Sequence, residues 1–215
     1  MYNPVKDGIK KTVQYVQYSE AIPPSDLVGL VHSFWELKTN TVLGDDFFLH
    51  VLPDACINIL FNLSDPKIAA ITARHTTYVE LNLGKSFHYV GIQFLPGMWQ
   101  GNRNEIVHGF VDTPYKGNLP LPETATKLTQ LDFSAGQLVL SELVRQLVEK
   151  NLVVNNVVTT RILADIEVID TVTDMAASAN LSPRQLQRTL KKKRDFLRTT
   201  FLRFCDCNNL SEGII

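Results

Sequence analysis

The spacing of apolar residues changes once along the chain, from an alternating pattern in the first half to a helical period in the second. Between residues 47 and 95, short runs rich in β-branched and aromatic residues are separated by turn-forming Pro, Asp, Ser and Gly. The runs are FFLHVL, CINILFNL, KIAAITA, TTYVELNL and HYVGIQFL. Five closely spaced strands of this kind predict an antiparallel β-barrel or sandwich.

The segments that flank these five runs are less regular. Residues 27–37, LVGLVHSFWEL, follow a Pro-Pro-Ser-Asp turn and fit either a short helix or a strand. Residues 96–122 are punctuated by Gly and Pro, which predicts loops with one helical turn near residues 101–107. We therefore expect residues 1–120 to form one β-rich domain.

From residue 121 onward, apolar residues recur every three or four positions, as they do on one face of a helix. The clearest stripe consists of Leu138, Leu140, Leu143, Val144, Leu147 and Val148. We expect residues 121–156 to form a helical bridge, whose stripe either packs on its own domain or pairs with a second copy. A further helix is expected at residues 157–166, and a bend at residues 169–171 precedes the next one. The fold class is therefore α+β.

Residues 171–193, TVTDMAASANLSPRQLQRTLKKK, predict two short helices joined by a turn. In the first, Val172, Met175 and Ala176 form a slim apolar face that allows close packing. In the second, Ser182 is the expected N-cap and Pro183 the first helical residue, a pairing that favours a helix start. Leu186 and Leu190 lie four residues apart on one apolar stripe, while the rest of this helix is polar or basic.

This pair of helices fits a helix-turn-helix, whose second helix enters the major groove of DNA. Arg can bond guanine and Gln can bond adenine through paired hydrogen bonds, so these side chains suit base recognition. The expected base contacts are Arg184, Gln185, Gln187 and Arg188. The expected phosphate contacts are Ser182, Lys191 and Lys192. The alternative is a basic surface helix with a favourable cap and no partner.

Two sets of residues resemble the AraC/XylS-type transcription regulators. DMAA at 174–177 followed by LSPRQLQR at 181–188 is similar to the first helix-turn-helix of that family. SFW at 33–35, LPDAC followed by LFNL at 52–63, and GIQF followed by PG at 91–97 resemble its β-rich N-terminal domain. The resemblance implies a cupin-like sensing or dimerisation domain over residues 1–120 and a first helix-turn-helix over residues 157–193. It also implies double-stranded DNA as a partner, with a small-molecule effector and a homodimer left open.

The chain departs from this family after Lys193. The family carries two helix-turn-helix units, whereas residues 194–215 lack its TGxSPxxFxxxxRLQ connector. We therefore expect a truncated DNA-binding domain with impaired binding. Synonymous codons read in a shifted frame from Lys193 can spell TGFSPHDFFKVLRLQQSF, which indicates a one-base slip in the codons of residues 191–193. The nucleotide sequence tests this hypothesis, whose alternative is a natural short tail. On the slip hypothesis, Cys205 and Cys207 form no metal or redox site.

Composition and charge narrow the range of functions. The 215 residues are 45 % hydrophobic and 20 % charged, as in an ordinary globular protein. The net charge of −1 gives no global attraction to nucleic acid, so the basic residues after Pro183 have to supply it. Neither a signal-peptide core nor an apolar stretch of about 20 residues is present, which predicts a cytoplasmic protein without a membrane segment. Of the three cysteines, Cys56 is expected in the core, and no disulfide is expected.

Other candidate sites have simpler explanations. The histidines lack an H-x-H pair with a nearby Glu, so we expect core or surface roles and no metal or other cofactor; they are His32, His50, His75, His88 and His108. Asp45, Asp46 and Asp54 could act as acid/base carboxylates, but turn and cap roles explain them equally well, and no nucleophile is paired with them. Four aromatic residues could line a ligand pocket, but we expect each of them to pack in the core; they are Trp35, Tyr89, Phe94 and Trp99. We expect no enzyme, and the rival hypothesis is a cupin-like small-molecule-binding module or enzyme that does not bind DNA.

Overall fold

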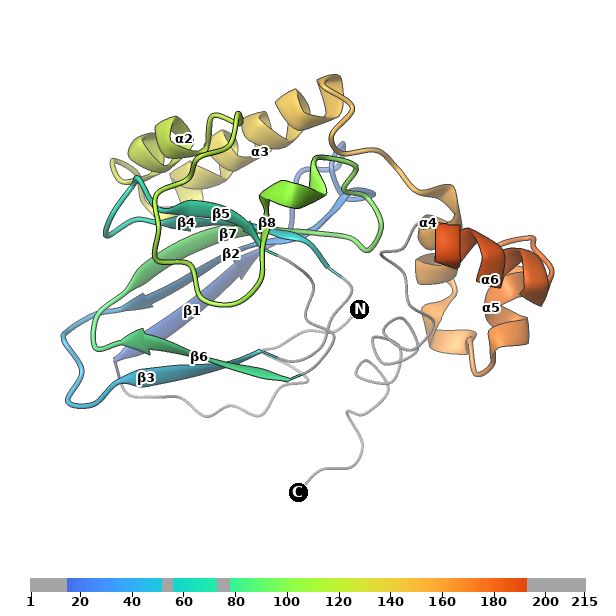
Figure 1. Cartoon of the computed structure of the whole chain (residues 1–215), viewed down its shortest axis with the longest axis horizontal. Helices are drawn as coiled ribbons and strands as arrows, with labels where there is room; N and C mark the ends of the chain where they lie inside the picture. The colour runs from blue at the N-terminus through green and yellow to red at the C-terminus, as the bar shows by residue number, and fades with distance from the viewer. Residues whose placement is uncertain (1–14, 52–55, 73–77, 193–215) are drawn as a thin grey trace.

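The computed structural model describes residues 15–51, 56–72 and 78–192, and their fold is α+β (Figure 1). The larger sheet has six strands in the order β1-β2-β7-β4-β5-β8. Their bounds are β1 Val16–Ala21, β2 Val31–Thr39, β7 His88–Phe94, β4 Asn58–Asn62, β5 Ala69–Thr72 and β8 Ile106–Val107. The pairs are antiparallel except β5–β8, which is parallel. A second, two-stranded sheet pairs β3, Phe47–Val51, with β6, Val79–Gly84.

All five strand-like runs are confirmed as strands β3 to β7. The expected barrel is not formed by the described strands, because they make two separate sheets that face each other as an open sandwich (Figure 1). Residues 27–37 begin as a turn and then enter β2, so the strand was the correct alternative there. The expected helical turn near residues 101–107 is a 3-10 turn at Arg103–Glu105, followed directly by β8.

The two central strands, β2 and β7, carry one apolar core on each face. Alternate residues of a strand point to opposite faces of the sheet. On one face, Phe34 and Ile92 lie opposite each other and pack towards the helices. On the other face, Leu37 and its partner Tyr89 pack against the β3–β6 sheet together with Leu83.

Helices α2, Leu121–Leu128, and α3, Phe133–Glu149, cover the outer face of the larger sheet (Figure 1). The apolar stripe of α3 is docked on this sheet, as in the first of the two alternatives; its buried members are Leu140, Leu143, Val144 and Leu147. Leu138 is an exception to the expected stripe, because its side chain is 75 % exposed. It lies two positions from Leu140, which places it on the opposite side of the helix.

The linker between α3 and the next helix is paired with the residues that follow β7. Gln100 N–H donates to Leu152 O at 2.8 Å, and Val154 N–H donates to Met98 O at 2.9 Å. Trp99 and Val153 form an antiparallel bridge between these bonds, and both side chains are buried. The linker is therefore held by backbone pairing as well as by apolar packing.

Helices α4, Val157–Ala164, α5, Val172–Ser178, and α6, Pro183–Lys192, follow this linker, with a 3-10 turn, η2, at Ile166–Val168. They match the helices expected from residue 157 onward. They surround a small core of their own, made of Ile162, Ile169, Met175, Ala176, Ala179 and Leu186. In Figure 1 this helical unit lies beside the β-rich part.

The close approach of Trp35 to Gly91 fixes the centre of the sheet. These residues are direct partners in the β2–β7 pair. A Cβ atom placed on Gly91 would lie 2.2 Å from the Trp35 ring, which is much shorter than van der Waals contact. The ring therefore occupies the space that a side chain at position 91 would need.

We predict that Gly91→Ala destabilises the protein by about 1–3 kcal/mol, because overpacking displaces the Trp35 ring. Urea unfolding followed by tryptophan fluorescence measures this change. Gly44→Ala is the matched control, since nothing lies within 4 Å of a Cβ built there. Equal unfolding midpoints for the two variants would contradict the prediction.

Candidate functional site

The predicted site lies on α5, the following turn and α6. Helix α5 begins with a capping box, in which Thr171 Oγ1 accepts from Asp174 N–H at 3.2 Å and Asp174 Oδ2 accepts from Thr171 N–H at 2.9 Å. The hydrogen bond from the Thr171 hydroxyl, with smaller contributions from backbone amides, lowers the pKa of the Asp174 carboxyl. The first turn of α5 is thus stabilised by local polar contacts.

The turn between α5 and α6 has a defined backbone. Asn180 adopts a positive φ of 54°, a conformation that Asn tolerates better than most residues. Leu181 N–H donates to Ala176 O at 2.8 Å, and the Leu181 side chain packs on the small core. Arg161 of α4, which the sequence did not indicate, donates from Nη1 to Ala179 O at 3.4 Å and so caps the end of α5.

Helix α6 begins with a second capping box. Ser182 Oγ accepts from Gln185 N–H at 3.3 Å, which confirms Ser182 as the N-cap. In return, Gln185 Oε1 accepts from Ser182 N–H at 2.8 Å. The Gln185 side chain, expected at a base edge, is therefore folded back onto its own helix start.

One side of α6 is buried and the other is open to solvent. Leu186 is completely buried against α5, so this half of the expected apolar seam is present. The four side chains expected at base edges are all exposed; they are Arg184, Gln185, Gln187 and Arg188. Lys191 and Lys192 belong to α6, but their side chains and that of Leu190 lie outside the described part, as do residues 194–215.

The charge of α6 differs sharply from that of the remaining chain. Its ten residues hold four cationic side chains and no acidic one. Because the whole chain has a formal charge of −1, the other residues sum to −5. Cationic charge is thus concentrated on the helix with the exposed face, which is an arrangement that attracts anions locally.

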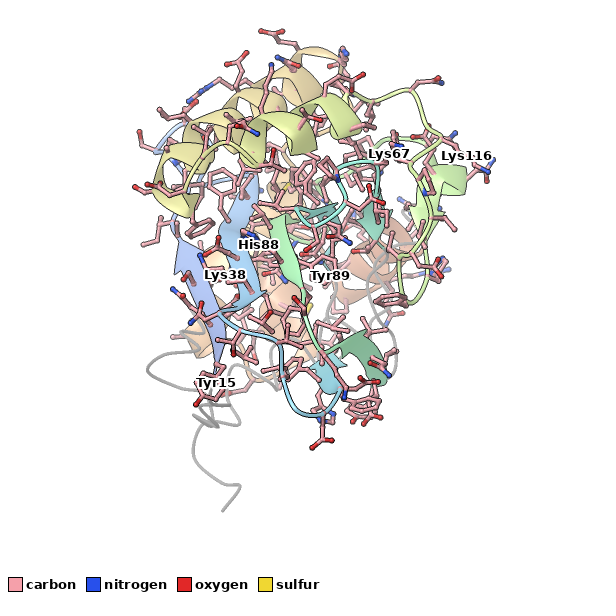
Figure 2. All side chains as sticks on the ribbon, turned by 90° about the vertical axis from the view of Figure 1, so that its left-hand side faces the viewer. Tyr15, Lys38, Lys67, His88, Tyr89 and Lys116 are labelled. Carbon is pink, nitrogen blue, oxygen red and sulfur yellow. The ribbon has the colours of Figure 1, made fainter. Side chains whose placement is uncertain are left out.

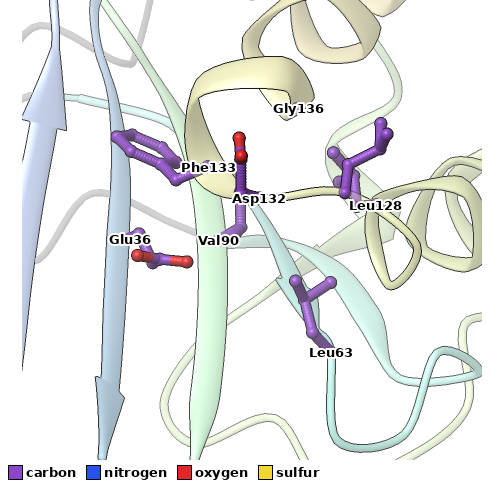
Figure 3. A pocket seen from close by; sticks show the side chains of 8 residues that line it. Glu36, Leu63, Val90, Leu128, Asp132, Phe133 and Gly136 are labelled. Carbon is purple, nitrogen blue, oxygen red and sulfur yellow. The ribbon is translucent and has the colours of Figure 1, made fainter.

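A second polar feature lies under the α2–α3 corner, where a crevice that is partly open to solvent is lined by Glu36 and Asp132 (Figure 3). The Glu36 residue is only 3 % exposed. Its Oε1 lies 2.9 Å from His88 Nε2, and its Oε2 lies 2.9 Å from Lys38 Nζ. Lys38 and His88 lie on the neighbouring strands β2 and β7 (Figure 2).

The sequence did not single out this Glu36–Lys38–His88 cluster. The sequence signal for this cluster is that Phe34, Glu36 and Lys38 alternate on one face of a strand. That signal can be used only once residues 31–39 are known to form a strand. Two cationic or proton-donating partners compensate the burial of the carboxylate. The cluster is therefore a satisfied part of the sheet and leaves no unpaired acid for catalysis.

Among the other residues considered from sequence, His108, Asp45 and Asp46 are exposed. His50 Nδ1 is hydrogen-bonded to the Tyr78 hydroxyl on the β3–β6 sheet, and burial lowers the pKa of His32. No group of three or more His, Cys, Asp or Glu side chains suited to a metal occurs among the described residues. Cys56 is buried, as expected. His75 and Asp54 lie outside the described ranges.

The aromatic residues considered for a pocket pack in the core. Phe94 is completely buried, and its ring centroid lies 5.8 Å from that of Trp99. Tyr89 is buried between the two sheets, and this burial raises the pKa of its hydroxyl. Trp35 packs at the edge of the same core. Core packing is therefore the correct alternative for these four residues.

We predict that Leu186→Ala destabilises the helical unit by about 2–5 kcal/mol, because it opens a cavity in a core of few side chains. Hydrogen exchange should show faster exchange across α4 to α6 while the amides of β2 and β7 stay protected, since their core is separate. Leu138→Ala is the control, because its side chain is mostly exposed. Equal loss of protection in the sheet would contradict the separation of the two cores.

Acid should weaken the start of α5. The folded state lowers the pKa of Asp174, so its stabilising contribution is present above the unfolded value of about 3.9 and is lost as pH falls through the folded value. We predict that Thr171→Ala moves the pKa of Asp174 back towards its ordinary range in an NMR titration of the carboxyl carbon. Thr173→Ala, an exposed change on the same helix, should leave this titration unchanged. An unmoved Asp174 titration in Thr171→Ala would disprove the role of the capping box.

No described helix is long and apolar enough to cross a membrane.

Comparison with known proteins gives one match, to a family model. No curated protein and no solved structure matches the chain. The scan of family models gave no helix-turn-helix match, so the AraC/XylS resemblance stays a prediction. Residues 19–114 match the family described as "Domain of unknown function (DUF6597)", so the part of the chain from β1 to the loop after β8 is similar to that domain, and α2 to α6 lie outside the match.

Proposed function

We propose that this protein is a sequence-specific DNA-binding transcription regulator of the AraC type. The observation that carries the proposal is the exposed face of α6, where Arg184, Gln187 and Arg188 project from a helix that is capped at its start and packed on α5. A helix that enters the major groove needs such a face, with donors near its N-terminus and an apolar side that docks on the preceding helix.

The charge pattern supports a nucleic acid as the partner. Arg184 and Arg188 lie four residues apart and therefore on the same side of α6. Like charges at this spacing destabilise an isolated helix by about 0.2–0.5 kcal/mol, and α6 has no acidic side chain to offset the repulsion. An anionic partner would offset the repulsion between the two arginines. In a helix that only faces solvent, the same repulsion would have no compensating benefit.

The β-rich part is proposed to sense an effector or to hold two copies together. The backbone pairing of Met98–Gln100 with Leu152–Val154 supports this role, because it connects the end of β7 to the linker before α4. A small-molecule effector and a homodimer are both part of the proposal. A regulator of this kind acts on DNA in the cytoplasm and needs no catalytic residue.

Weak binding is expected from one reading helix. The described residues contain one proposed helix-turn-helix, α5 with α6, and its second helix can enter only one segment of the major groove. Few phosphate contacts give a low affinity and a shallow salt dependence. We therefore expect a Kd of about 10⁻⁶ M or weaker at physiological salt, close to the range of non-specific binding.

We predict that Arg184→Ala and Arg188→Ala each lower the affinity for a selected duplex by about 1–3 kcal/mol, because each removes a donor from the reading face. A fluorescence-anisotropy titration at low ionic strength measures the loss. Lys127→Ala on α2 removes the same charge from an exposed site outside the proposed interface and should leave the affinity within twofold. Equal affinities for the wild type and both arginine variants would favour the rival, a small-molecule-binding module without DNA binding.

A further inference from the structure

We infer that the base-reading set of α6 is narrower than its exposed residues suggest: Arg184 and Arg188 read two closely spaced guanines, and Gln185 is a positioning residue that holds the start of the helix. This inference rests on the proposed function, and it specifies the DNA sequence that the same surface would recognise.

The hydrogen bonds of Gln185 conflict with a role in reading adenine. Reading adenine takes both ends of a Gln amide, because Oε1 accepts from the N6 amino group while Nε2 donates to N7. Gln185 Oε1 already accepts from Ser182 N–H at 2.8 Å. Turning the side chain towards a base would leave this amide at the first turn without its partner. Gln185 therefore acts through Ser182 and α6, and not through a base.

Ser182 remains available for its expected phosphate contact. Its Oγ accepts the hydrogen bond from Gln185 N–H, and this leaves the hydroxyl hydrogen to donate elsewhere. The capping box therefore fixes the hydroxyl at the helix start, where a phosphate oxygen can accept from it. Gln185 supports the phosphate contact by holding this turn in place.

The two arginines occupy the ridge of α6 that lies farthest from its packed side. Each lies two positions from the buried Leu186, which at about 100° per residue places it nearly opposite that side chain. Gln185 and Gln187 are each one position from Leu186, so they lie on the two flanks. Arg184 and Arg188 thus project the most directly into a groove that α6 enters.

The spacing of the ridge sets the spacing of the bases. Four residues of helix rise by about 6 Å, and successive bases on one strand are about 3.4 Å apart. Two side chains at this separation reach guanines within about two base-pair steps of each other. Guanine is the base that Arg recognises through paired bonds to O6 and N7.

Gln187 provides a matched comparison for Gln185. Both are exposed glutamines on α6, one on each flank. Gln185 is held by the capping box, whereas the Gln187 side chain makes no hydrogen bond to another described residue. Gln187 is therefore able to read a base, and its removal should change base preference where removal of Gln185 does not.

The test is selection from a random duplex library at low ionic strength, followed by affinity measurements, with the full 215-residue chain. The wild type should enrich two guanines within about two steps. Arg184→Ala and Arg188→Ala should each lose one guanine and bind the selected duplex about 5-fold to 150-fold more weakly. Gln185→Ala should enrich the same sequence with a uniform loss of about 2-fold to 10-fold.

Gln185→Glu separates positioning from base reading. Its carboxylate can accept from Ser182 N–H, so the hydrogen-exchange protection of that amide should be lost in Gln185→Ala and restored in Gln185→Glu. Its added negative charge should lower affinity for all duplexes equally. The inference would be overturned if Gln185→Ala changed the preferred base at one position of the selected sequence as much as Gln187→Ala does.

The outcomes also distinguish this inference from the proposed function. A wild-type chain that enriches a defined sequence lacking the guanine pair retains the proposed function and refutes the inference. A wild-type chain that enriches no sequence refutes both. Arginine variants that each lose one guanine, while Lys127→Ala retains both, support the reading ridge.

Discussion

The antiparallel pairing of β2 with β7 is the constraint on which the remaining structure depends. Its alternate residues separate the two cores, since Phe34 and Ile92 face α2 and α3 while Leu37 and Tyr89 face the β3–β6 sheet. Gly91 admits the Trp35 ring at the centre of this pair. The end of β7 then leads into the residues that bridge to the linker. A shift of one residue in this register would exchange the two faces of the sheet.

The helical unit is stabilised differently from the β-rich part. Its core contains few side chains, and a small core contributes little free energy of folding. Local polar contacts compensate at its helix ends, with capping boxes at Thr171 and Ser182 and the Arg161 contact at the end of α5. These contacts do not use Arg184 or Arg188. The unit can therefore present arginines without relying on them for stability.

The buried Glu36 illustrates how chemistry that resembles a site can be structural. A buried carboxylate that lines a crevice suggests binding or catalysis, yet both of its oxygens have partners on β2 and β7. Removing one partner from such a cluster leaves a buried charge uncompensated. Lys38 and His88 are thus required by the position of Glu36 in the sheet, whereas Arg184 and Arg188 of α6 make no ion pair with another described residue.

The sequence by itself determined the local features: five strands, the helices from residue 121 onward, the Ser182 cap and the buried and exposed sides of α6. These depend on neighbours within about four residues, whose spacing is visible in the chain. The tertiary structure decided that residues 31–39 form a strand, that the sheets stay open, that Leu138 faces solvent and that Glu36 meets His88. Each of these depends on pairing between residues far apart in the chain. The bond between Gln185 and Ser182 is local, yet Gln185 had two competing partners, a base or its own helix, and only the structure shows which of them its side chain contacts in the absence of DNA.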